Sequence, residues 1–504
     1  TSNLPRLYQK YIGHDNNRDF FASTQSETRA MNAVMYQQWF PQIVYNHHQT
    51  GPAGTVLFMP PFRDPFNYRF DPLIPAGIDT VGAAMATRLL EENKPGATTR
   101  SGSPYSTWWN GGLRTTCYFH NMIGLLTETI GNPTPITIPF IAAKQLPKAD
   151  LISPIPPQVW HFRQSVDYSV SANKAVLDIA SKHRQQFLFN IWRMGHNSIE
   201  RGNRDSWTIS PHQLQSVVTE RGAVAIDKLH TAEARDPRGY IIPRSQKDFP
   251  TACKFVQTLL DNGIEVEQAT EDFTVAGKTY GKGSLIVRCA QAFRPHILDM
   301  FEAQDHPDDF AYPGGPPVPP YDIAGWTLAM QMGIQYDRVM DSFNIPAKIV
   351  VGTLSGGDSE ATISDANWFT FPHDMNDSFT VVNRLLRSGK QVYWMKDGIN
   401  SGKFAVAKSL GLIDLLKDYS KSLGVTFTGM NTMTGKALAL KSGKTALWDR
   451  YGGSIESGWT RFVLEKFEFP FEVVFPPSFD AGNLNSKYTS IVFPNGAVNV
   501  GRGR

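Results

Sequence analysis

Cysteine is scarce in this sequence, which holds only Cys117, Cys253 and Cys289 among 504 residues. The three are widely separated and odd in number, so they exclude a CxxC metal or redox motif and argue against a disulfide framework. Charge is also low: charged residues make up 19%, the net charge is +3, and both signs are mixed throughout. A nucleic-acid-binding protein usually shows a clustered basic face, which is absent here. No apolar run approaches the roughly 18 residues of a membrane helix, so no membrane span is expected.

The length and the alternation of helical and strand-like segments predict several α/β domains in one chain. The first segment alternates helix, strand and helix, and the last contains three strand-like runs with a helix between the first two, which is typical of a doubly wound sheet. A proline-rich stretch, Tyr312–Pro320, indicates an ordered surface loop or linker. The predicted divisions are an α/β domain (1–148), a helical extension (149–221), a small α/β domain (222–351), a mixed segment (352–440) and a doubly wound domain (441–504).

Within the first domain, local signals place two strands and the helix that precedes them. Thr24 and Glu27 have the spacing of a capping box, which predicts that a helix begins there. Its apolar residues recur at helical spacing and predict a buried face made of Met31, Val34, Met35 and Trp39. Two strand-like runs follow, Gln42–Tyr45 and Ile123–Leu126. A second helix is predicted over residues 81–92, and residues 159–201 are predicted to be mostly helical.

Three short polar motifs in this domain carry groups suited to catalysis. Asn17 and Arg18 form a polar turn, and an arginine offers a planar fork for a carboxylate. His47 and His48 end the first strand, and neutral imidazole suits zinc. Glu128 ends the second strand, where a partly buried carboxylate can be tuned as a general base.

In their order and spacing these motifs resemble the zinc metallocarboxypeptidases of the carboxypeptidase A type. The resemblance extends from the first motif to Glu128 and implies a mixed-sheet catalytic domain. It implies that Asn17 and Arg18 bind the carboxylate of the substrate, that His48 is a zinc ligand and that Glu128 is the catalytic base. The family often has an aspartate where this sequence has Asn46, so the support of the zinc-binding histidine would differ here. Near the family's mobile tyrosine this chain has Trp109 and Tyr105, and neither is assigned that role.

The same family supplies two further zinc ligands from a His-x-x-Glu motif upstream of the Asn-Arg turn, and only 16 residues precede Asn17. The one His-x-x-Glu in this sequence, His230–Glu233, lies outside the first domain and out of order. The resemblance therefore implies that the chain is the C-terminal part of a larger enzyme whose missing N-terminal segment completes the site. We expect the 504-residue chain alone to bind zinc weakly and to lack peptidase activity.

The last segment has a second resemblance, to the start of a glutamine-amidotransferase-like domain such as follows the peptidase in some long bacterial members of the family. The motifs that carry it are Leu447–Tyr451, Gly458–Phe462 and Asp480–Leu484. No cysteine follows Cys289, so the nucleophile of glutamine hydrolysis is not visible and the segment is interpreted as structural or as a binding module.

Together the resemblances imply a secreted or periplasmic carboxypeptidase that uses zinc and takes peptides with a free C-terminal carboxylate. Two alternatives stay open at this point. One is an amidohydrolase of related fold that acts on a small acylated amino acid. The other is a non-catalytic binding protein with a degenerate peptidase fold. Side-chain preference and oligomeric state do not follow from the sequence.

Overall fold

The structure is a computed structural model that describes residues 15–218, 226–321, 327–354, 356, 357, 362–451 and 453–497. The chain divides into two compact units, one built from residues 17–244 and 258–350 and the other from residues 1–16, 245–257 and 351–504. Both units combine helices with sheets, which confirms the predicted α/β class. The predicted boundary between residues 221 and 222 lies outside the described residues, as do Gly13 and His14 of the first motif.

The first sheet has four strands in the order β1-β4-β2-β3. Strands β1 and β4 are parallel, β4 and β2 are antiparallel, and β2 and β3 are parallel, so the sheet is mixed as predicted. All seven residues of β4 are buried. The strands are β1 (Ile43–His48), β2 (Leu57–Phe62), β3 (Ala97–Arg100) and β4 (Ile123–Thr129).

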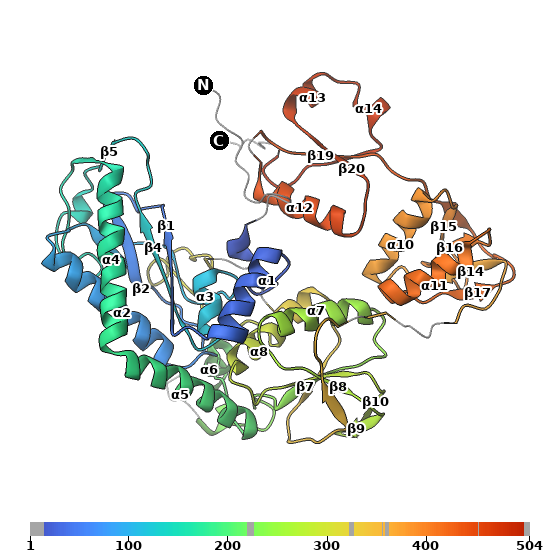
Figure 1. Cartoon of the computed structure of the whole chain (residues 1–504), viewed down its shortest axis with the longest axis horizontal. Coiled ribbons are helices and arrows are strands. Elements are labelled where there is room, and N and C mark those ends of the chain that lie inside the picture. Colours follow the sequence, from blue (N-terminus) through green and yellow to red (C-terminus); the bar gives the residue numbers. More distant parts are fainter. Residues whose placement is uncertain are drawn as a thin grey trace. The chain divides into compact units, whose positions relative to one another are not determined.

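Helices cover both faces of this sheet (Figure 1). Helix α2 (Leu73–Glu91) lies on one face with α4 (Phe162–Lys182) beside it, and α3 (Leu113–Tyr118) lies against β1 and β4. A Cβ atom on Gly77 of α2 would meet Ile123, whereas a Cβ atom on Gly124 would lie 1.8 Å from the carbonyl oxygen of Arg114 in α3. Neighbouring residues of a strand point to opposite faces. The odd-numbered side chains of β4 therefore face α2, and the even-numbered ones, including Glu128, face α3.

Helix α2 begins at Leu73, eight residues before the predicted start. It is the one helix of the described residues that is long and apolar enough to cross a membrane by length and composition. Its residues Ile74, Ile78, Val81 and Met85 are fully buried in the core below the first sheet. Such burial is the environment of a core helix, so the expectation of no membrane span is not contradicted.

The helix before β1 differs from its prediction in two respects. It begins at Ser26 as α1 (Ser26–Ala33), and the N–H groups of Thr24 and Gln25 donate to the carboxylate of Asp19, so the predicted Thr24 capping box is wrong. It continues as the π-helix η2 (Val34–Trp39). The predicted buried face is also wrong, because Trp39 is 80% exposed.

Two of the four residues predicted to form that face, Met31 and Val34, are likewise exposed, and only Met35 is buried. The buried side of α1 itself is polar and carries Thr28 and Asn32, whereas Met35 and Tyr36 are buried in η2. Asn32 donates to the carbonyl oxygen of Phe20, to Ser23 and to Asn262. Tertiary hydrogen bonds thus decide which face is buried, and apolar periodicity does not report them.

The rest of this unit consists of helices and a second, five-stranded antiparallel sheet in the order β12-β7-β11-β8-β13. The helical stretch predicted for residues 159–201 is confirmed as α4 and α5. Two short strands, β5 (Ile136–Thr137) and β6 (Val159–Trp160), also pair in this unit. Its further elements are α5 (Arg184–Asn203), α6 (Pro211–Val217), β7 (Gly239–Ile242), β8 (Glu267–Ala269), the hairpin β9 (Phe273–Val275) and β10 (Lys278–Tyr280), β11 (Leu285–Arg288), α8 (Arg294–Phe301), α9 (Leu328–Gln331), β12 (Asp337–Val339) and β13 (Ala347–Ile349). Helix α7 (Phe249–Asp261) is divided between the two units.

The other unit contains an antiparallel five-stranded sheet in the order β17-β14-β16-β15-β18 and a parallel three-stranded sheet in the order β20-β19-β21. The three strands and the helix predicted for the C-terminal segment are confirmed. The elements are β14 (Trp368–Phe371), α10 (Asn376–Arg387), β15 (Val392–Met395), β16 (Phe404–Ala407), α11 (Leu412–Leu423), β17 (Thr428–Met430), β18 (Ala437–Ala439), β19 (Thr445–Trp448), α12 (Ile455–Lys466), β20 (Phe471–Val474), α13 (Pro476–Asp480), α14 (Leu484–Lys487) and β21 (Ser490–Val492).

Candidate active site at the ends of strands β1 and β4

The two strands that end in the predicted site residues lie side by side. Strand β1 pairs with β4 in parallel, and the register sets His48 opposite Glu128. Residues paired in this way point to the same face of a sheet, so His48 and Glu128 share the face that α3 covers. The carboxyl ends of neighbouring parallel strands are a common place for ligand binding in α/β proteins. The structure therefore brings together two residues that are 80 positions apart in the sequence.

Glu128 is a buried carboxylate with both oxygen atoms engaged. The residue is only 4% exposed. Oε2 accepts a hydrogen bond from the backbone N–H of Thr50 at 2.7 Å, and Oε1 accepts one from the hydroxyl of Tyr105 at 2.8 Å. Two donors from different segments fix the orientation of the carboxylate, which is what a positioned acid or base requires.

Tyr105 stays protonated in this arrangement. Burial and the neighbouring charge of Glu128 raise the pKa of the Tyr105 phenol above its ordinary value. A protonated phenol can only donate to a carboxylate. Tyr105 is therefore a fixed hydrogen-bond donor to Glu128 across the whole pH range in which proteins are usually folded.

The ring of His48 contacts the amide of Asn46, which lies on the same face two residues earlier. The His48 Nε2 atom is 2.9 Å from the Asn46 amide nitrogen, while the amide oxygen is buried without a hydrogen-bond partner among the described residues. The oxygen and nitrogen of an amide are assigned from hydrogen bonding. In the opposite orientation the oxygen accepts from Nε2–H, and Nδ1 of His48 keeps the lone pair that a metal needs.

His47 belongs to the other face of the sheet. Its ring packs against Tyr45 with centroids 4.3 Å apart, and its Nε2 atom is 3.1 Å from the side-chain oxygen of Asn173 on α4. Since His47 is turned toward α4 and His48 toward α3, the two imidazoles have no common ligand position. This agrees with the alternation of side chains along a strand.

Asn17 and Arg18 belong to the short 3-10 turn η1 (Asn16–Arg18), which contacts the beginning of α3. The side-chain oxygen of Asn17 accepts from the N–H of Leu113, the first residue of α3, at 2.8 Å. The Arg18 guanidinium lies 5.1 Å from the centre of the Trp109 ring. Asn17 is consequently a structural anchor between its turn and α3, and Arg18 donates to the carbonyl oxygen of Asn17 at 2.9 Å within the same turn.

A row of aromatic rings connects Glu128 to Arg18. Tyr105, the donor to Glu128, packs edge-on against Tyr321 with ring centroids 4.9 Å apart. Tyr321 in turn lies 6.4 Å from Trp109, the ring beneath Arg18. Sequence reasoning noted Tyr105 and Trp109 but missed Tyr321, because no local signal links it to a segment more than 200 residues earlier.

Arg114 is a second cation beside this row, and sequence reasoning missed it as well. It is 3% exposed, and its guanidinium lies 4.2 Å from the ring of Phe62 and 6.0 Å from that of Tyr105. It donates to the carbonyl oxygen of Ser106 at 2.6 Å and to the hydroxyl of Tyr118 at 3.1 Å. Arg114 therefore holds the segment that carries Tyr105 against α3.

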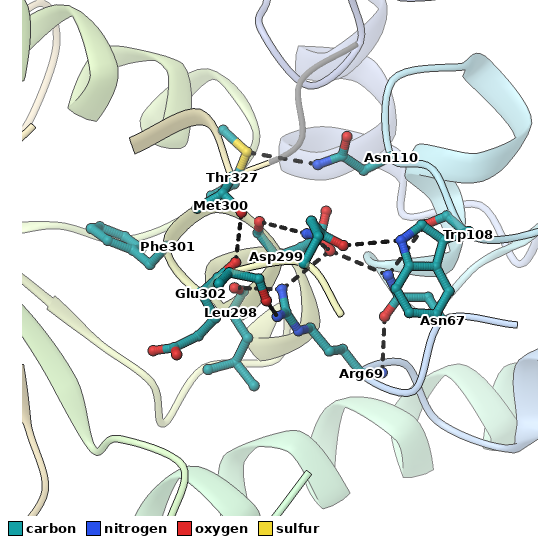
Figure 2. A network of polar contacts seen from close by, with 12 residues as sticks. Asn67, Arg69, Trp108, Asn110, Leu298, Asp299, Met300, Phe301, Glu302 and Thr327 are labelled. Atoms are coloured by element: carbon teal, nitrogen blue, oxygen red, sulfur yellow. Dashed lines mark hydrogen bonds and ion pairs between the residues drawn. The ribbon is translucent and has the colours of Figure 1, made fainter. Parts of the chain in front are cut away.

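A polar network also holds the segment that carries Tyr105 and Trp109, through contacts with Trp108 (Figure 2). The amide nitrogen of Asn67 donates to the carbonyl oxygen of Trp108 and to the carboxylate of Asp299. Arg69 donates to Asp299 and to the carbonyl oxygens of Leu298 and Ala303. Burial raises the pKa of Asp299, and the charge of Arg69 opposes that rise. This network joins the end of α8 to the segment that carries Trp109.

The residues present at this site do not form a complete zinc site. Catalytic zinc uses three protein ligands and keeps one position open for water. Within the described ranges, no group of three or more His, Cys, Asp and Glu side chains is arranged to hold a metal ion. His48 is the one residue of this site that the resemblance predicts as a zinc ligand.

Two other histidine–glutamate pairs have ordinary structural roles. His196 and Glu200 form a contact of 3.2 Å one turn apart on α5, as their spacing predicts. His230 packs edge-on against Trp207 with ring centroids 5.1 Å apart, and the pair His230–Glu233 is remote from β1 and β4 in the sequence. Neither pair supplies a further ligand to His48.

No family model, no curated protein and no solved structure matches this chain in the three comparisons with known proteins.

Proposed function

We propose that this protein is a metallocarboxypeptidase, an enzyme that removes the C-terminal residue of a peptide with the help of zinc. The observation that carries the proposal is the register of β1 and β4, which sets the predicted ligand His48 beside the predicted base Glu128 on one face of the sheet. The aromatic row then connects Glu128 to Arg18, the predicted binder of the substrate carboxylate.

The chain's own residues supply binding and proton transfer in this proposal. Arg18 and Asn17 bind the terminal carboxylate of the peptide, as the resemblance implies, and the side-chain oxygen of Asn17 fixes their turn to Leu113. Glu128 takes a proton from the water whose oxygen attacks the last peptide carbonyl. As the C–N bond breaks, that proton passes to the departing amine, which leaves as a free amino acid. Tyr105 keeps the Glu128 carboxylate oriented throughout.

Zinc would polarise the carbonyl and the attacking water as a Lewis acid. A zinc ion at this site would need two protein ligands besides His48. In this proposal they come from an upstream His-x-x-Glu pair, as the resemblance implies. A non-catalytic binding protein remains the second candidate, because the described residues contain no three-ligand group. In that case Arg18 and the aromatic row would still bind a carboxylate ligand.

The test is a substrate panel that separates the three function classes. The purified protein, including any coding region upstream of Thr1, is incubated with zinc and with peptides or N-acyl amino acids. Release of single C-terminal residues from peptides longer than two residues supports the carboxypeptidase. Hydrolysis confined to N-acyl amino acids indicates a deacylase, and binding without hydrolysis of either indicates the binding protein.

A further inference from the structure

A cavity of about 250 Å³ lies where the loop after β2, the start of α6, the end of α8 and strand β12 come together. The described residues that line it do not include Arg18, His48 or Glu128. The part of its wall that belongs to the network of Figure 2 consists of Asn67, Arg69, Trp108, Leu298 and Glu302. We propose that this cavity is a second binding site for a neutral, polyhydroxylated ligand, either a monosaccharide or the terminal sugar of a glycan. The proposal does not depend on the peptidase activity.

The charged side chains of the cavity wall are balanced by neighbours. The contacts are Arg69 with Asp299, Asp236 with Arg294, Asp305 with His212 and Glu302 with Arg338. A charged ligand would have to compete with these contacts, and taking one partner from a buried ion pair is costly. The wall contains groups of both signs, so a ligand with a net charge would also meet groups of its own sign. The charge balance therefore favours a ligand without net charge.

One of these ion pairs retains hydrogen-bonding capacity for a ligand. Oε1 of Glu302 accepts from Nε of Arg338 at 2.9 Å and from the hydroxyl of Tyr240 at 2.7 Å. Nη2 of Arg338 donates to the carbonyl oxygen of Arg235 at 3.1 Å. Among the described residues, Oε2 of Glu302 and Nη1 of Arg338 have no hydrogen-bond partner. Since a hydroxyl group both donates and accepts, the hydroxyls of a sugar can donate to this carboxylate and accept from this guanidinium.

An amide and an aromatic ring add to the wall. Oε1 of Gln213 accepts from the N–H of Ser210 at 2.9 Å, and the amide nitrogen of Gln213 supplies a further donor. Tyr68 is 40% exposed, and its ring stands edge-on to that of Trp108 with centroids 5.3 Å apart. Aromatic side chains offer a large apolar surface together with a polar group. One side of a sugar ring presents C–H groups that pack on such a surface, while its hydroxyls reach the polar groups around it.

The size of the cavity limits the ligand to a single sugar unit. Pockets for drug-sized ligands have volumes of about 300–1,000 Å³, and this cavity of about 250 Å³ is smaller. The exposure of Tyr68 and of Arg338, whose side chain is 39% exposed, shows that the cavity reaches the surface. A terminal sugar can therefore enter while the rest of a glycan stays outside.

The test measures binding by ligand-observed NMR on the purified protein. Glucose, galactose and N-acetylglucosamine are each added at about 10 mM, a concentration that detects a ligand with a Kd near 1 mM. Alanine, as a zwitterion, and inorganic phosphate, as an anion, are the comparison ligands. We expect at least one sugar to bind with a Kd on the order of 1 mM, since a small ligand makes few contacts. Alanine and phosphate should neither bind nor displace the sugar.

Variants locate the binding in the cavity. Arg338→Met should weaken sugar binding by at least about tenfold, the effect of losing a hydrogen bond from a charged group. Tyr68→Ala should weaken it by about three- to tenfold, the range of an aromatic contact. Glu302→Gln, which replaces the free carboxylate oxygen by a donor, should also weaken it and serves if Arg338→Met does not fold. Tyr312→Ala, an exposed tyrosine that does not line the cavity, is the control and should leave binding unchanged.

Three results would overturn the proposal. The first is that none of the three sugars binds. The second is that a sugar binds with the same Kd to the wild type and to the folded variants of Tyr68, Glu302 and Arg338. The third is that alanine or phosphate binds more tightly than the sugars and loses its binding in Arg338→Met, which would assign the cavity to a charged ligand.

Discussion

Strands β4 and β19 each pair with a parallel neighbour, and each ends beside a buried carboxylate. The two carboxylates differ in their hydrogen-bond partners. At the end of β4, Glu128 accepts from the N–H of Thr50 and the hydroxyl of Tyr105, which come from two other segments. Directly after β19, Asp449 accepts from the N–H of the next residue, Arg450, and from the hydroxyl of Ser454. Both acids are at most 5% exposed.

Burial at the end of a parallel strand is thus insufficient to define a reactive group. Ser454 caps α12 by accepting from the N–H of Ser457, so Asp449 belongs to the local structure that begins a helix. Glu128 instead has a histidine in register beside it and an arginine at the other end of an aromatic row. The partners from distant segments, rather than the carboxylate itself, distinguish the candidate site.

The largest expected effect is on kcat, and it should distinguish Glu128 from Asp449. Glu128→Gln should lower kcat for peptide hydrolysis by about 10² to 10⁴ or more, since the variant loses the proton acceptor. Asp449→Asn should leave kcat within about a factor of two, because the site does not use it. Steady-state kinetics check both on the zinc-loaded protein that includes any coding region upstream of Thr1. If Glu128→Gln kept more than about a tenth of the activity, the base would have to be another group.

The next effect concerns the other end of the aromatic row. Arg18→Met should weaken kcat/KM for free-carboxylate peptides by the equivalent of about 2–5 kcal/mol, the loss of one partner from a buried charge pair. Arg163, which is on the surface of α4 and pairs with Asp167, offers the control variant Arg163→Met. A similar loss in both variants would mean that Arg18 acts through general electrostatics and does not bind the carboxylate.

A stability prediction tests the close approach of α3 to the strand that carries Glu128. Gly124→Ala should destabilise the protein by about 3 kcal/mol or more, because the new Cβ meets a backbone oxygen that cannot move aside. Gly195 on α5 is the matched control, since its Cβ would have its nearest neighbour at 3.4 Å. Gly195→Ala should be neutral or stabilise by up to about 1 kcal/mol. Urea denaturation midpoints that shift equally would contradict the described packing of α3.

The smallest expected effect is the contribution of Glu92 to stability. Glu92 lies on the opposite face of the first sheet, between α2 and α4. Hydrogen bonds from Lys94 and Ser171 lower the pKa of Glu92 from 4.5 to about 2. A lowered pKa contributes stability above the unfolded value, and that contribution is lost as the pH falls toward 2. Because Glu92 is partly exposed, Glu92→Gln should cost about 1 kcal/mol at pH 7.

The pH dependence provides the control for this pair. The difference between wild type and Glu92→Gln should shrink between about pH 4.5 and pH 2, measured from the denaturation midpoint at each pH. The neighbouring exposed residue supplies the comparison variant Glu91→Gln, measured in the same way. A difference that stays constant with pH would indicate that packing, and not charge, accounts for the effect of Glu92.

The strands of the site were predictable, and the environment of the site was not. Short strand-like runs located β1, β4 and the three parallel strands of the C-terminal segment, and polar residues marked the ends of β1 and β4. The register that pairs His48 with Glu128, and the ring of Tyr321, depend on contacts between segments far apart in the chain. Such contacts leave no local pattern in a single sequence.

The helix before β1 gives a second example of what the sequence alone could not predict. The apolar positions of α1 and of the π-helix η2 predicted one buried face, yet Trp39 of η2 is exposed and Asn32 of α1 is buried. The buried amide has specific partners in Phe20, Ser23 and Asn262, and these partners outweigh the apolar pattern. Arg114 escaped prediction for a related reason, since a buried arginine held by a carbonyl oxygen and a phenol has no sequence signature.

The most direct test of the proposed site compares two peptides that differ only at the C-terminus, one with a free carboxylate and one with an amide. The zinc-loaded protein, including any coding region upstream of Thr1, is incubated with each, and mass spectrometry follows the loss of the last residue. Arg18 and Glu128 acting as proposed predict rapid release of one residue from the acid and a rate at least about 30-fold lower for the amide, the lower bound for losing a partner of a buried charge. Equal rates for the two peptides would contradict the account.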